Sequence, residues 1–280
     1  MKIITTTTQQ IIIVLIFMIT SFTQAQKLQK IKGSKVVTLT EIDLDSVTSI
    51  ELYSNIDLIL KNGETDKLTI YADDNLHDVL DVDLNGGKLS LSLLKTITRK
   101  KKFELTLYVR NLSLIILDDD STIINNDFYK TENLNIVLNN NSEFECFIEA
   151  ESIVLESNDT SDANFTFKAK NIEYTLQDRS DAKGTSNAEV TKITLDGRTS
   201  IVLNGKSDET IIDIKDSSNA KLASLLSKLT EIEAEDKTSV YTNTTEDLTI
   251  KVKGSSKIYI YGKAEIDLIE FKNKAILYKK

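Results

Sequence analysis

A pattern of about 19 residues recurs in register along the chain from residue 111 onward, and it limits the possible folds more than any other feature. Each copy has an alternating apolar segment, a short polar turn that ends in a hydroxyl or amide residue, and one further apolar residue. The residue that ends the turn serves as an anchor, and the nine anchors are Ser121, Ser142, Ser161, Ser180, Thr199, Ser218, Thr238, Ser256 and Asn273.

Apolar columns surround these anchors. The residue two positions after the anchor is apolar in every copy, from Ile123 in the first to Ala275 in the last. The residues four and six positions before the anchor are also apolar, except for Ser157 in the third copy and Asp267 in the last. Alternate residues of a strand point to the same side of a sheet, so these columns predict one shared inward face.

The spacing separates a β-solenoid from other repeat folds. A repeat of this length is too short for a strand and a packed crossover helix, and the leucine-rich repeat signature is absent. In a β-propeller blade, successive strands run in opposite directions, so like positions would match only in every second copy. The sequence therefore predicts an all-β protein with a parallel β-helix or β-solenoid of about nine coils over residues 111–280, in which neighbouring coils stabilise one another.

An irregular β region is predicted to precede the coils, over residues 26–110. Its expected strands are 47–53, 56–60, 67–71, 79–84, 88–94 and 103–109. Asn62-Gly63 and Asn85-Gly86 are turn signals, and the second is flanked by apolar alternation that is typical of a hairpin. The basic run at 99–102 is predicted to be a solvated loop tip, with an anchor for an anionic glycan as the alternative.

Residues 1–25 have the features of a signal peptide, with Lys2 followed by an apolar run at 11–19 and a cleavage site before Gln26. The run is shorter than an ordinary membrane span, and an uncleaved anchor is the alternative. We therefore expect an exported protein in the periplasm, on the outer surface or outside the cell, with no membrane span after cleavage. The net charge of −9 argues against nucleic acid as a partner.

Few residues are candidates for catalysis. Cys146 is the one cysteine, so no internal disulfide forms, and its strand position predicts an outward-facing small residue, not a nucleophile. His77 is the one histidine and is predicted to lie in a surface loop; a lone histidine cannot form a histidine-rich metal site. No catalytic residue is predicted.

Asp118, Asp119 and Asp120 are the candidate metal ligands. They lie one coil away from the amides at 139–141, and calcium favours such a collection of oxygen donors. The alternative is structural, because stacked amides and hydroxyls can hydrogen-bond from coil to coil as Asn ladders do in cross-β assemblies. No other cofactor is expected.

Four segments resemble the head GIN domain family, also called putative auto-transporter adhesins. They are residues 50–60, 68–76, 82–91 and the Gly-Ser-containing stretch 252–262. Where that family tends to have glycine in its turns, this chain has Asp or Asn. The resemblance implies an exported β-helical protein of Bacteroidetes-like bacteria with no established enzyme activity.

These features together favour a non-enzymatic, adhesin-like or structural interaction module of the cell envelope that binds glycan or protein. Two alternatives remain. One is a polysaccharide-acting enzyme, since carboxylates are plentiful. The other is a periplasmic module that binds calcium or a small ligand. The sequence leaves the oligomeric state open.

Overall fold

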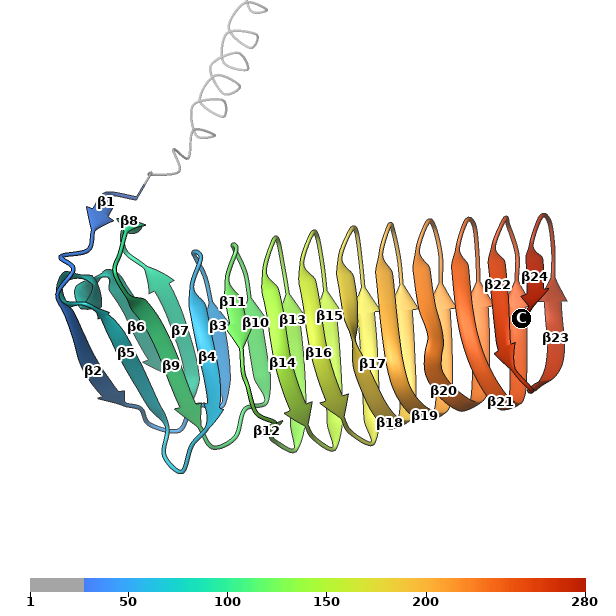
Figure 1. The fold of residues 1–280 in the computed structure, drawn as a ribbon, viewed down its shortest axis with the longest axis horizontal. Coiled ribbons are helices and arrows are strands. Elements are labelled where there is room, and N and C mark those ends of the chain that lie inside the picture. The colour runs from blue at the N-terminus through green and yellow to red at the C-terminus, as the bar shows by residue number, and fades with distance from the viewer. Residues whose placement is uncertain (1–27) are drawn as a thin grey trace, which may run out of the picture.

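The computed structural model describes residues 28–280, and it shows a long parallel β-solenoid with a mixed β region at its N-terminal end (Figure 1). The predicted signal peptide lies outside the described residues. The chain is almost entirely β-structure, interrupted by the short 3-10 helix η1 (Asp74–Val79). Within the described part of the chain, no helix has the length and apolar character needed to cross a membrane.

Two strands, or two halves of a longer strand, line the interior of each coil. The early coils use β10 (Leu114–Leu117), β11 (Thr122–Ile124), β12 (Tyr129–Lys130), β13 (Asn133–Leu138), β14 (Glu143–Glu149), β15 (Ser152–Ser157), β16 (Asp162–Lys168) and β17 (Asn171–Leu176). The later coils use β18 (Asp181–Leu195), β19 (Ser200–Ile214), β20 (Asn219–Ala234), β21 (Ser239–Val252), β22 (Lys257–Gly262), β23 (Glu265–Phe271) and β24 (Ile276–Lys279). The long strands bend midway, so that one strand contributes to both sides of the solenoid.

The coils stack in parallel and in register, as predicted. Ile123 lies beside Phe144, Phe144 beside Ala163, and Ala163 beside Ala182, and this column continues to Ile258. Every side chain in the column from Ile123 to Ile258 is at most 3% exposed. Stacking thus buries side chains that a single coil would leave in water, and this burial stabilises the array.

The turns repeat one backbone conformation. Two residues before each of the first eight anchors, φ is positive, with values from 50° at Asp119 to 94° at Gly197. Asp or Asn fills six of these eight positions and Gly fills two, at 197 and 254. Asp and Asn tolerate the left-handed region better than other residues with a side chain. The turns therefore keep a left-handed residue without a conserved glycine column.

Most of the anchor hydroxyls form coil-to-coil hydrogen bonds, as predicted, and Ser142 is the exception among the first eight. The first eight anchors are at most 1% exposed. The Thr199 hydroxyl donates to the Ser218 hydroxyl at 3.0 Å, and Thr238 donates to Ser256 at 2.9 Å. The Ser180 hydroxyl lies 2.8 Å from the Ser157 carbonyl oxygen of the preceding coil.

A second row of buried hydroxyls follows the opposite bend of the later coils, and the sequence analysis did not find it. Ser207 donates to Thr191 at 3.0 Å, and Thr210 donates to Ser227 at the same distance. These bonds satisfy buried hydroxyls where long strands turn from one side of the solenoid to the other.

Both ends of the anchor column differ from the prediction. β3 (Ser49–Leu52) and β4 (Asp57–Asn62) form one more coil, with Leu58 beside Ile123, and the apolar Ile56 takes the anchor position. At the other end, the assignment of Asn273 was wrong. Ile258 pairs with Leu277, not with Ala275, because the register of β23 slips between its pairings with Ile250 and Lys251. Ala275 therefore occupies the last anchor position.

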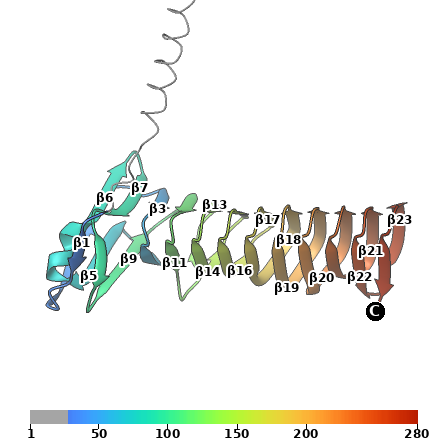
Figure 2. The same cartoon turned by 90° about the horizontal axis from the view of Figure 1, so that it is seen from above.

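The remaining strands form the head, which we define as residues 28–48 and 63–110. They are β1 (Lys30–Lys32), β2 (Val37–Asp43), β5 (Lys67–Asp73), β6 (Leu80–Asn85), β7 (Lys88–Leu93), β8 (Thr96–Arg99) and β9 (Phe103–Val109). β9 runs parallel to β4 and antiparallel to β5, while β7 runs parallel to β3 and antiparallel to β6. The head thereby covers the outer edge of the first coil, as Figure 2 shows from above.

The predicted strands of the N-terminal region all form, with ends within two residues of those expected, whereas β1, β2 and β8 were not predicted. The predicted hairpin at Asn85 is confirmed. Asn85 pairs with Lys88, and Gly86 and Gly87 both have positive φ, at 58° and 86°. That geometry matches a two-residue type I′ turn.

Candidate functional site

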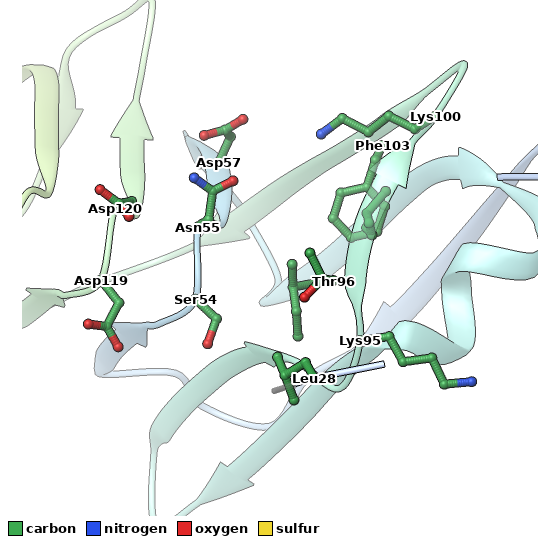
Figure 3. A pocket seen from close by; sticks show the side chains of 12 residues that line it. Leu28, Ser54, Asn55, Asp57, Lys95, Thr96, Lys100, Phe103, Asp119 and Asp120 are labelled. Atoms are coloured by element: carbon green, nitrogen blue, oxygen red, sulfur yellow. The ribbon is translucent and has the colours of Figure 1, made fainter. Parts of the chain in front are cut away.

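A cleft of about 440 Å³ lies between the head and the first turns of the solenoid (Figure 3). One wall comes from the solenoid turns and the other from the head. The lining residues are Leu28, Ser54, Asn55, Asp57, Leu93, Lys95, Thr96, Ile97, Lys100, Phe103, Asp119 and Asp120. Its volume falls within the range of small-molecule sites in proteins.

Two stacked turns build the acidic wall. Ser54 and Asn55 lead into β4, and Asp119 and Asp120 occupy the equivalent positions one coil later; all four have positive φ, between 50° and 65°. The Asn55 backbone N–H donates to the Asp119 carbonyl at 2.8 Å, which fixes one turn on the other. Asp57 adds a third carboxylate from the start of β4, and all three carboxylate side chains are on exposed residues.

The opposite wall is basic and apolar. Lys100 lies beside Phe103 in Figure 3, with its ammonium 5.4 Å from the centre of the ring, whereas Lys95 lies farther along the wall and its side chain points away from the ring. Leu28 reaches this wall because β1 pairs with β8, with Lys30 beside Thr96. An apolar ring thus lies beside the Lys100 cation and faces three carboxylates across the cleft.

A buried carboxylate holds the loop that carries Lys100. Asp73 is fully buried and accepts hydrogen bonds from the backbone N–H groups of Lys35, Lys101 and Lys102, at 3.0–3.1 Å. Burial raises the pKa of Asp73, but these N–H donors and the charge of Lys101 outweigh it, so that the net shift is downward. The carboxylate therefore stays ionised and fixes the loop between β8 and β9.

A second buried carboxylate joins two segments of the head, just before β3 and just after β9. Asp66 is 4% exposed and accepts from Val47 N at 2.8 Å and from Arg110 Nε at 3.0 Å. Burial alone would raise the pKa of Asp66, yet the hydrogen bonds and charge of Arg110 and the bond from Val47 lower it overall. Neither Asp66 nor Asp73 was identified from the sequence, because nothing in the local pattern distinguishes them from surface acids.

The structure separates the three predicted calcium ligands. Asp118 faces its own turn, where its side chain accepts from Asp119 N at 2.8 Å and from the Asn140 amide. Asp120 accepts from the Asn141 amide at 2.7 Å, and Asp119 lines the cleft with it. Among residues 28–280, no group of three or more His, Cys, Asp or Glu side chains has the arrangement of a metal site. Calcium binding at Asp118, Asp119 and Asp120 stays a prediction.

The amides predicted to pair from coil to coil do so here. The Asn140 and Asn141 side chains bond to the preceding coil's Asp118 and Asp120, and Asn158 donates to Asn139 at 3.0 Å. These bonds support the structural interpretation of the polar turns.

The remaining sequence candidates lie away from the cleft or have another role in it. The basic run forms the loop between β8 and β9, as expected, but the prediction missed that Lys100 lines the cleft. The prediction for Cys146 was wrong. Cys146 points to the inward face together with Phe144 and Ile148 and is 1% exposed, and burial raises the pKa of its thiol. His77 lies on η1, half-buried, with Nε2 2.9 Å from the Thr38 hydroxyl.

Comparisons with known proteins agree with this architecture. The sequence model of the family described as "putative auto-transporter adhesin, head GIN domain" matches residues 46–264. The crystal structure of a "putative adhesin" from Parabacteroides distasonis is similar with a TM-score of 0.69 and 15% identity, over 90% of this chain and all of that one. No curated protein matches the sequence.

Two further solved structures have the same fold. A "putative adhesin" from Parabacteroides merdae has a TM-score of 0.62 and 17% identity, over 90% of this chain and 100% of that chain. A "putative lipid binding protein" from Parabacteroides distasonis has a TM-score of 0.61 and 15% identity, over 89% of this chain and 96% of that chain. At sequence identities this low, the structural similarity establishes a shared fold only.

Proposed function

The chain belongs to the family described as "putative auto-transporter adhesin, head GIN domain", and from that premise we propose that it is an exported, non-enzymatic binding module of the cell envelope. Its ligand is a short glycan segment held in the cleft between the head and the solenoid. The observation that carries this proposal is the pairing of an acidic wall with a wall that contains an aromatic ring beside the Lys100 ammonium.

A saccharide matches both walls of the cleft. Its hydroxyls can donate hydrogen bonds to Asp57, Asp119 and Asp120 and can accept them from Lys100. Its apolar C–H face can pack on the exposed part of Phe103 and on the aliphatic residues beside it. Ligand sites commonly combine an apolar lining with a few fixed polar groups in this way.

The exposure of the acids supports binding over hydrolysis. Asp57, Asp119 and Asp120 are all on exposed positions of the two turns. A carboxyl that protonates a glycosidic oxygen is usually kept neutral by an apolar environment. The rigid double turn instead supplies fixed hydrogen-bond acceptors, which suits recognition.

A lipid is the second candidate ligand, favoured by the apolar part of the head wall. Leu28, 43% exposed, lies with Leu93, Ile97 and Phe103 on that wall, and one structural neighbour is named a lipid-binding protein. An acyl chain would contact these residues and leave the carboxylates of the opposite wall unused. Substitutions on the acidic wall therefore separate the two candidates.

The test uses the signal-free chain on a glycan array, followed by isothermal titration with the best-binding oligosaccharide. Asp119→Asn should weaken binding about tenfold or more, since it removes a charged hydrogen-bond acceptor. Asp236→Asn is the matched control, because Asp236 has the same left-handed turn position, with φ of 62°, far along the solenoid. A chain that binds no glycan, or one whose binding Asp119→Asn leaves unchanged, would contradict the proposal; retention of a fatty acid by both variants would favour the lipid.

A further inference from the structure

In the last coil, formed by β23 and β24, the side chains at the inward positions are exposed, whereas the equivalent side chains of the inner coils are buried. In the preceding coil, Leu248, Ile250 and Val252 are at most 1% exposed. Their partners in β23 are Ile266, Leu268 and Phe271, which are 38%, 43% and 46% exposed. The inward columns of the solenoid therefore continue onto an apolar surface, which we term the tail face and define as residues 265–280.

The tail face also has free strand edges. Within the described residues, β23 pairs with β21 and β24 pairs with β22, and each strand has no hydrogen-bonded neighbour on its outer side. Open edges are templates for pairing with another strand, and proteins often block them with proline or inward-pointing charges. This chain contains no proline, and the inward positions of β23 carry Ile, Leu and Phe.

The opposite end of the solenoid cannot cover the tail face of another copy. Both strands of the first coil are already paired on their outer sides, β3 with β7 and β4 with β9, so the head occupies the stacking surface there (Figure 1). Head-to-tail stacking of coils is therefore blocked. A tail face can meet another tail face, and two identical surfaces that meet in this way are related by a two-fold axis.

The charges of the two strands are complementary to each other. β23 carries Glu265, Asp267 and Glu270, of which Glu270 pairs with Lys272 at 2.7 Å, so that Glu265 and Asp267 are the acids that face outward for a partner. β24 ends in Lys279 and is flanked by Lys274 and Lys280. The two strands lie on opposite sides of the interior and run in opposite directions. A two-fold axis along the strands places β23 of one copy antiparallel over β24 of the other, so that each acidic strand faces a basic one.

We propose that a second copy of this chain covers the tail face, with β23 of each copy paired to β24 of its partner. This arrangement continues the hydrophobic interior across the junction and satisfies the open strand edges. The resulting dimer is a rod with a head and a cleft at each end, which presents two binding sites that face away from each other. The proposal depends on the tail face and not on what the cleft binds.

Sedimentation of the signal-free chain over a range of concentrations tests the proposal. We expect a concentration-dependent dimer. Leu268→Lys should weaken it roughly tenfold or more, because a charge would be buried in the junction. Leu226→Lys is the matched control: Leu226 on β20 is 42% exposed, almost as Leu268 is, and lies away from the tail face. A wild-type chain that stays monomeric, or equal effects of the two variants, would overturn the proposal.

A charge exchange tests the strand arrangement itself. The variant Glu265→Lys/Asp267→Lys makes both facing strands basic, and the variant Lys279→Glu/Lys280→Glu makes both acidic, so each alone should lose the dimer. Mixed together, they should form a heterodimer, since every acidic strand again faces a basic one. Failure of the mixture to associate, with both variants folded by circular dichroism, would contradict the paired β23–β24 junction.

Discussion

The two ends of the solenoid solve the same packing problem in different ways. At the N-terminal end, the head pairs with both strands of the first coil, and Ile56, Leu58 and Leu60 are at most 1% exposed. At the C-terminal end, the inward side chains of β23 remain between 38% and 46% exposed. Each coil of a solenoid is stabilised by the neighbours that pack on its two faces. One end is covered by the chain's own head, whereas the other end has inward side chains that, under our proposal, a second copy covers.

The largest expected effect comes from weakening the covered end. Leu107→Ala in β9 should cost about 3 kcal/mol in the free energy of unfolding, because Leu107 is fully buried and faces the first coil. In dilute protein, where the chain is monomeric, Ile266→Ala at the open end should lower the free energy of unfolding by well under about 1 kcal/mol, because this side chain is already partly exposed to water. Urea unfolding followed by far-UV circular dichroism measures both values. Equal losses would mean that the two ends are covered alike.

The buried carboxylate of Asp66, which joins two segments of the head, gives the next effect, and this effect depends on pH. The folded-state pKa of Asp66 is below the unfolded value, so its contribution is fully present above about pH 4 and is lost as the pH falls through the folded pKa. Asp66→Asn should therefore reduce stability at pH 7 by roughly 2 kcal/mol and should flatten the loss of stability below pH 4. Unfolding curves at pH 7, 5 and 3 check this. An unchanged pH slope in the variant would show that Asp66 does not carry the acid sensitivity of the head.

A smaller effect is expected from the hydroxyl ladder between the two ends. Ser180→Ala removes a donor that lies 2.8 Å from the Ser157 carbonyl oxygen, and it should cost about 1 to 2 kcal/mol. Ala275→Ser, at the equivalent position of the last coil, should change stability by less than about 0.5 kcal/mol, because no further coil packs against it. Thermal unfolding of both variants distinguishes a true ladder from a row of inert small residues. Ligand binding in the cleft should be unaffected by either change.

Calcium binding would give an effect of similar size at the covered end. If Asp118, Asp119 and Asp120 hold the ion, calcium at tenfold above its dissociation constant adds about 1.4 kcal/mol to stability. The increase should disappear in Asp118→Asn/Asp120→Asn and should persist in Asp236→Asn. Calorimetric titration of the signal-free chain follows the binding directly. No heat and no rise in melting temperature at millimolar calcium would end this hypothesis.

The middle of the solenoid was predictable because its signal is local and repeated. The hydroxyl anchors and their apolar neighbours recur in each copy, so the register of one coil predicts that of the next. At both ends the anchor is apolar, Ile56 in the first coil and Ala275 in the last. A search based on hydroxyl anchors therefore missed the first coil and displaced the last by two residues.

The cleft could not be predicted, because its walls come from separate parts of the sequence. Phe103 and Asp119 come close together only when the head folds back over the first coil. No local sequence pattern around Asp57 or Lys100 predicts that these residues line one cleft. The outward prediction for Cys146 failed for a simpler reason: Phe144 was assigned inward, and a residue two positions later in an unbroken strand must share its face. Asp119 and Asp120 were singled out as calcium ligands, which stays a prediction, and the structure places them on a cleft wall beside Asp57.

Hydrogen–deuterium exchange along the coils tests the difference between the two ends most directly. The account predicts slow exchange in β4 and β9 at every protein concentration, since their backbone groups are paired on the covered end. It predicts fast exchange in β23 and β24 of dilute protein and marked slowing as the concentration rises and tail faces pair. Equal protection of both ends at all concentrations would contradict the account.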